Sequence, residues 1–266
     1  MAAERAGAGE SMMLQDDVPI IVDAFEELWR AHVPVPLPDT IVWKYGRIES
    51  WFFTQMTADG APTVRRKRPA TIRAQNILSK VAKAMRAHRR AGAPGDVVAR
   101  WIGGEPGEPC RVMYLTSDAL QHFLANIVDK GHGVLQRWCA QTTEHCVAAR
   151  AHWSSHLFSL ECRSNIHPIS ARHVPLPERT ATFEGGTKAT TVAVCNNHLR
   201  KQIEAYMVSI ADAVNTRLVP THKVWQLQVT FVPDTHGVVW LSWFSVMQVN
   251  LAEISPICGG LRQPAA

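Results

Sequence analysis

The sequence predicts an α+β protein, in which an antiparallel sheet with packed helices closes on a helix followed by a β-hairpin. Helical and strand-like patterns follow one another without the regular strand–helix alternation of a parallel sheet. Near the end, "NNHLRKQIEAYMVSIADAVNTRL" repeats its apolar residues at helical spacing, and the runs "KVWQLQVTFV" and "VVWLSWFSVMQV" flank the turn "PDTHG". Because the last run is apolar on both faces, we expect it to be central in a sheet or covered on both sides.

Earlier elements follow from local patterns in the same way. Acidic residues and a proline introduce a short amphipathic helix over "DDVPIIVDAFEELWRA", and "TIVWKYGRIESWFFTQMTADG" predicts strands interrupted near Gly46. A second helix is expected over "TSDALQHFLANIVDKG", capped by Thr116 or Ser117. The alternating runs "HCVAARAHW" and "HLFSLECRS" predict an antiparallel pair joined at Ser154 and Ser155.

We expect residues 16–252 to form one α+β domain between two flexible tails, residues 1–15 and 253–266. The stretch "AGAPGDVVARWIGGEPGEP" contains five glycines and three prolines. This composition predicts a loop over residues 91–109.

Composition favours a cytoplasmic protein with reduced thiols. The six cysteines include no CxxC pair, and Glu4 and Glu10 interrupt the region where a secretory signal would be apolar. The longest charge-free apolar run, residues 238–252, is shorter than the roughly 20 residues that a membrane span requires. The sequence thus predicts no membrane span.

One segment supplies the excess positive charge. Residues 65–90 hold ten Lys and Arg and no Asp or Glu, and from Thr71 onward their apolar members fall at helical spacing. Such a basic amphipathic helix is suited to an acidic protein surface, with nucleic acid as the alternative partner. The predicted partner-binding residues are Arg65, Arg66, Lys67, Arg68, Lys80, Lys83, Arg86, Arg89 and Arg90.

No catalytic motif is present: the chain lacks GxSxG, GxxxxGK[ST] and a GxGxxG that follows a strand. We therefore predict no catalytic residue and no cofactor. Residues 132–173 are nevertheless rich in His and Cys, which are zinc ligands. A minority hypothesis is a metal site in this cluster, formed by Cys146, His152, His156 and Cys162.

The runs "GVLQRW", "RAHWSSHLFSLECRSN", "ATFEGG" and "VVWLSWFSVMQV" resemble, over residues 133–250, uncharacterised proteins of flagellated and ciliated eukaryotes. The resemblance implies a cytoskeletal or flagellar component that works through its surfaces. Our main prediction is therefore a non-enzymatic structural or binding protein that docks on an acidic partner surface. An RNA- or DNA-associated protein that uses residues 65–90 is the alternative, and a metal-containing enzyme built on residues 132–173 is the second alternative.

Overall fold

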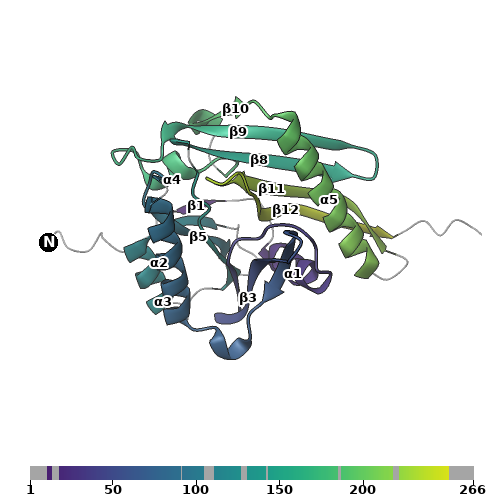
Figure 1. The fold of residues 1–266 in the computed structure, drawn as a ribbon, viewed down its shortest axis with the longest axis horizontal. Helices are drawn as coiled ribbons and strands as arrows, with labels where there is room; N and C mark the ends of the chain where they lie inside the picture. Colours follow the sequence, from purple (N-terminus) through teal and green to yellow (C-terminus); the bar gives the residue numbers. More distant parts are fainter. Residues whose placement is uncertain are drawn as a thin grey trace, which may run out of the picture.

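Two antiparallel sheets form the framework of the computed structural model (Figure 1). The structure describes residues 11–13, 18–90, 92–104, 111–126, 131–141, 143–184, 187–217 and 222–251. The seven-stranded sheet has the order β1 (Ser11–Met13), β6 (Arg111–Thr116), β5 (Val97–Gly104), β7 (His132–Arg137), β2 (Thr40–Lys44), β3 (Arg47–Met56), β4 (Pro62–Arg66). The five-stranded sheet has the order β10 (Thr190–Ala193), β9 (Phe158–Pro168), β8 (His145–Ser154), β11 (His222–Pro233), β12 (Val239–Leu251). The predicted α+β class is confirmed.

Helices cover both sheets. The described helices are α1 (Val18–Arg30), α2 (Ala74–Arg90), α3 (Ser117–Ala125), α4 (Leu176–Thr180) and α5 (Asn197–Arg217). Helices α2 and α3 pack on one face of the seven-stranded sheet around one hydrophobic cluster (Figure 1). A second cluster joins the opposite face of that sheet to α1, α5 and the five-stranded sheet. The rings of Phe25 and Phe244 meet edge to face within it, and Tyr206 stacks on Phe231.

The local signals in the sequence place several element ends correctly. The Thr116 hydroxyl accepts a bond from the backbone N–H of Ala119 at the start of α3, and the Asn196 side chain accepts one from Leu199 at the start of α5. Between β2 and β3, Tyr45 and Gly46 both have positive φ, as a two-residue hairpin turn requires.

The loop predicted over residues 91–109 is wrong in its middle, because Val97–Gly104 form β5 inside the seven-stranded sheet. Gly103 in this strand allows the Trp101 ring and the backbone of β7 to pack closely against it. A Cβ on Gly103 would lie 2.5 Å from the carbonyl oxygen of His132 and 2.6 Å from the Trp101 ring, and Gly133 is confined by the same ring. The composition of the segment therefore resembled that of a loop although its backbone is buried.

Two further expectations concern the sheet edges. Strand β12 ends the described five-stranded sheet and is covered on both faces, since Trp243 and Phe244 are buried, so it takes the second of the two expected arrangements. Ser11–Met13, assigned to a flexible tail, pair with β6. The remainder of that tail and residues 253–266 lie outside the described residues.

The apolar stripe of α2 is buried against the protein's own core. Ile77 and Val81 are buried, while Leu78 and Met85 pack at the edge of the same cluster. The helix is thus part of the fold, and its basic residues occupy the remaining sides. In the part of the chain that the structure describes, no helix has the length and apolarity of a membrane span.

We expect Gly103→Ala to destabilise the protein by about 1–3 kcal/mol, because the added methyl group must displace the Trp101 ring or the backbone of β7. The midpoint of urea unfolding measures this change. Gly60→Asn is the comparison without a steric clash. Gly60 has open space around it, and its φ of +81 lies in a region that asparagine tolerates better than most residues do. Equal stability of Gly103→Ala and the original protein would show that the strand relaxes freely.

Candidate functional site

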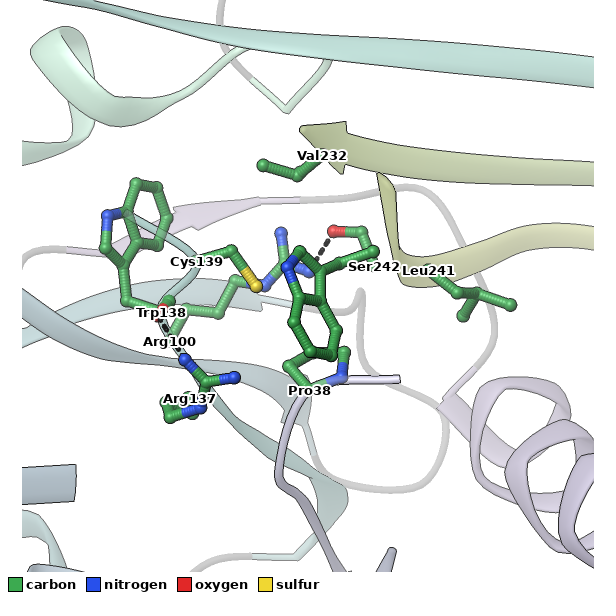
Figure 2. Close-up of a pocket in the computed structure, with 9 residues that line it drawn as sticks. Pro38, Arg100, Arg137, Trp138, Cys139, Val232, Leu241 and Ser242 are labelled. Carbon is green, nitrogen blue, oxygen red and sulfur yellow. Dashed lines mark hydrogen bonds between the residues drawn. The ribbon is translucent and has the colours of Figure 1, made fainter. Parts of the chain in front are cut away.

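A small pocket lies where the two sheets meet (Figure 2). Its accessible volume is about 20 Å³. This is room for about one water molecule. The lining residues are Pro38, Arg100, Arg137, Trp138, Cys139, Val232, Trp240, Leu241 and Ser242. The pocket is therefore too small to hold a substrate.

Arg100 is the central polar group beside this pocket. Its Nη2 lies 2.6 Å from Oε1 of Gln136 and also donates to the hydroxyl of Ser242, as Figure 2 shows for Ser242. Its guanidinium carbon lies 4.5 Å from the ring centroid of Trp243. Arg100 thus joins β5 and β7 of one sheet to β12 of the other.

Glu184 balances the charge of Arg100. Its Oε1 lies 3.7 Å from Nη1 of Arg100, and both side chains are buried, with 2% and 7% of their surfaces exposed. Oε2 of Glu184 accepts a bond of 2.9 Å from the backbone N–H of Thr182. Burial, with Glu184 as the next cause, raises the pKa of Tyr114 well above its ordinary value. The network stays compatible with burial because each charge has a partner.

The thiol of Cys139 also borders the pocket, but it is not suited to nucleophilic chemistry. Burial raises its pKa to about 11. The reactive form of cysteine is the thiolate, so this protonated thiol is inert at neutral pH.

A second group, the cation cluster, consists of Lys67, Lys80 and Arg137 around the carboxylate of Asp39. Nε of Arg137 lies 3.4 Å from Oδ2 of Asp39, and Nζ of Lys80 lies 4.0 Å from the same oxygen. Lys67 interacts electrostatically with both Asp39 and Lys80. Two cations therefore pair with one carboxylate, and a third interacts with it electrostatically, which leaves local positive charge.

Strand pairing builds the cation cluster. Thr40 pairs with Gln136 between β2 and β7, which places the preceding Asp39 beside the following Arg137. The backbone N–H of Arg137 donates to the carbonyl of Asp39 over 2.8 Å. The indole of Trp51 donates to Oδ1 of Asp39 over 3.0 Å. The carboxylate is thus held in place by groups from β3 and β7 and by Lys80 of α2.

The ammonium of Lys67 occupies a partly apolar setting. Nζ lies 3.5 Å from the ring centroid of Trp51. Burial lowers the pKa of Lys67 below the usual 10.5; Asp39 opposes this change, and the charge of Lys80 adds to it. An anion bound between these cations would reduce the repulsion between Lys67 and Lys80 and would offset the cost of removing Lys67 from water.

The structure divides the nine predicted partner-binding residues. Lys67 and Lys80 belong to the cation cluster. Arg66 lies 3.3 Å from Glu26 and over the Trp29 ring, so it packs within the fold. The other six are exposed, and their role as partner contacts stays a prediction: Arg65, Arg68, Lys83, Arg86, Arg89 and Arg90.

The proposed metal ligands are not brought together. Cys146 and His152 lie six residues apart on β8, a separation of roughly 20 Å in an extended strand. Cys162 forms a disulfide with Cys195, and burial raises the pKa of the Cys146 thiol to about 12. His156 lies in the turn after β8. No group of three or more His, Cys, Asp or Glu suited to a metal occurs among the described residues.

The disulfide also differs from the expectation that the cysteines are reduced. Cys162 and Cys195 are 33 residues apart in the sequence, and their Cα atoms lie 5.8 Å apart. The pairing of β10 with β9 brings them together, because Ala193 lies opposite Cys162. Sequence spacing contained no signal for this contact.

Asp39 and Arg137 were missed as site residues. Asp39 stands alone in a proline-rich segment, and Arg137 ends an apolar strand. Their proximity depends on the pairing of β2 with β7, and no local sequence motif predicts that pairing.

Comparison with known proteins gives structural matches only. No protein-family model and no curated protein sequence matches the chain. Similar solved structures are D-cycloserine synthetase DcsG (11% identity, 86% of this chain, 62% of that chain, TM-score 0.47) and an ADP complex of purK, N5-carboxyaminoimidazole ribonucleotide synthetase (12%, 89%, 45%, 0.38). D-alanyl-alanine synthetase A from Vibrio cholerae is a third (11%, 83%, 53%, 0.37). The chain spans less than two thirds of each of these three chains.

These matched structures are described as synthetases, which are enzymes. The prediction of a non-enzymatic structural or binding protein that docks on an acidic partner surface is therefore corrected and not kept. The TM-scores lie below 0.5, so the matches assign no activity to this chain. The resemblance to proteins of flagellated eukaryotes stays a prediction.

We expect Arg100→Met to destabilise the protein by about 3–5 kcal/mol, because it leaves the buried charge of Glu184 without its partner. Urea unfolding measures the loss. The double variant Arg100→Met/Glu184→Gln should recover part of it, since no buried charge remains. Equal losses in the single and double variants would show that the ion pair is not the cause.

Proposed function

We propose that the protein is an enzyme that holds the phosphate group of a small phosphorylated substrate at the cation cluster. The observation that carries this proposal is that Lys80 and Arg137 pair with the single carboxylate of Asp39, while Lys67 lies over the Trp51 ring that donates to the same carboxylate. With that carboxylate counted, the cluster retains two positive charges when its lysines are protonated. A phosphate monoester carries between one and two negative charges at neutral pH, which matches this excess.

The residue types in the cation cluster are suited to phosphate. A guanidinium can donate two parallel hydrogen bonds to phosphate oxygens, and an ammonium offers a compact charge with three donors. Arg137 and the two lysines provide both kinds of donor. Asp39 holds Arg137 and Lys80 by ion pairing, so less ordering is needed when a ligand binds.

The burial of these cations favours a small ligand over a macromolecule. Only 14% of the Arg137 side chain is exposed, and Lys67 is partly covered against Trp51. A phosphate on a small molecule can approach such recessed groups more closely than a broad polymer surface can. Lys80 is 45% exposed and marks the open side of the cluster.

Cations in this position also have a chemical role. Charge on phosphate oxygens is redistributed during phosphoryl transfer, and positioned Lys and Arg side chains stabilise it. In this chain Lys67 and Arg137 would supply that stabilisation from fixed positions, while Lys80 would follow the ligand from α2.

Binding of pyrophosphate and of ATP, measured by isothermal titration calorimetry, tests the proposal. Lys67→Gln and Arg137→Gln should each weaken binding roughly 10- to 100-fold, because each removes a charge-assisted hydrogen bond worth about 1.5–3 kcal/mol. Arg65→Gln is the matched control, since this exposed neighbour lies outside the cluster and should leave binding unchanged.

Loss of ATP in the presence of the protein is followed in parallel, and the two cluster variants should slow it. Pyrophosphate and ATP that bind equally well to the original protein and to both cluster variants would contradict the proposal. Binding that depends on Arg65 as strongly as on Arg137 would also contradict it, because it would indicate a diffuse surface charge.

Pyrophosphate binding should weaken as pH rises from 7 toward 10.5. The lowered pKa of Lys67 means that this lysine loses its charge at a lower pH than a free lysine does, so its contribution is complete below that pKa and disappears above it. Lys67→Arg should retain binding over the same range, because arginine stays protonated. Parallel pH profiles for the original protein and Lys67→Arg would exclude Lys67 as the titrating group.

A further inference from the structure

A groove lies between α2 and α3 on the outer side of the seven-stranded sheet, where Figure 1 shows the two helices side by side. Its accessible volume is about 280 Å³. Apolar side chains form most of its surface, and glutamine and serine side chains supply the polar part. The lining residues are Gln75, Leu78, Ser79, Val81, Ala82, Met85, Val98, Ser117, Leu120 and Gln121.

Positive charge continues the line of the groove along α2. Residues four and seven positions apart lie on one side of a helix. Arg86 and Arg89 stand four and seven residues after Ala82, which lines the groove, and both are exposed. Helical spacing thus places Arg86 and Arg89 beyond one end of the apolar groove.

We propose that this groove binds the hydrocarbon chain of a single-chain anionic amphiphile, a medium-chain fatty acid, with its carboxylate at Arg86 and Arg89. The apolar lining matches the chain, and the two arginines match the charge of the head group. The lining residues on α2 extend from Gln75 to Met85, a rise of about 15 Å along the helix, which an extended chain of about ten carbon atoms spans.

The groove is separate from the cation cluster. Lys80 lies on the side of α2 that faces Asp39, whereas Ala82, two residues and about 200° further around the helix, faces the groove. Each site can therefore be altered without contact with the other. The fatty-acid proposal does not rest on phosphate binding, and either proposal can fail alone.

Displacement of a fluorescent fatty acid by octanoate, decanoate and dodecanoate tests the proposal. Each added methylene should strengthen binding about three- to fourfold until the groove is filled near ten carbons, after which the affinity should level off. Decanol should bind at least tenfold more weakly than decanoate, because it lacks the charge that Arg86 and Arg89 would contact.

Variants separate the groove from general basic charge. Ala82→Trp should abolish decanoate binding by filling the groove, and Arg86→Gln/Arg89→Gln should weaken it at least tenfold. Arg73→Gln/Lys83→Gln removes two exposed charges, one just before α2 and one elsewhere on it, and serves as the matched control with unchanged binding. Circular dichroism and an unchanged midpoint of urea unfolding show that each variant is folded.

Several results would overturn the proposal. One is decanoate binding that survives in Ala82→Trp, and another is an affinity that ignores chain length. Co-sedimentation with phosphatidylcholine–phosphatidylserine vesicles, without binding of free decanoate, would assign the basic helix to a membrane surface instead. Self-association that depends on Ala82 and is unaffected by decanoate would assign the groove to a second copy of the chain.

Discussion

The guanidinium of Arg100 is buried between the two sheets, where it is paired with Glu184 and bonded to Gln136 and Ser242. A buried charge is costly unless its partners are in place, so this contact requires the seven-stranded and five-stranded sheets to meet in one arrangement. The neighbouring pocket has room for about one water molecule, which agrees with a structural role for this junction. The separation of the two sheets, and with it the position of Trp243, depends on this interaction.

Helix α2 connects that framework to the candidate sites. Ile77 and Val81 bury one side of the helix against the seven-stranded sheet. The side that bears Lys80 then faces Asp39, and the side that bears Ala82 faces α3 across the groove. One packing contact therefore decides the position of both charged and apolar surfaces. The sequence predicts this helix as one basic surface, whereas in the structure Lys80 and Ala82 face two different sites.

Local patterns predicted much of the fold. The helical spacing in α2 and α5, the turn at Gly46 and the cap at Thr116 each depend on contacts within a few residues, which a sequence displays directly. Strand β5 was missed because the glycine that resembled a loop signal serves close packing against Trp101. The sequence left open whether β12 is a central strand or a covered edge strand, because both faces are buried in either position.

The sequence by itself determined the α+β class, the basic character of residues 65–90 and the amphipathic nature of their helix, because composition and periodicity are properties of neighbouring residues. Only the tertiary structure decided which basic residues lie close together. Asp39 and Arg137 meet through strand pairing, and Cys162 meets Cys195 in the same way. Such contacts join residues that are far apart along the chain, so their chemistry exists only after the sheets have formed.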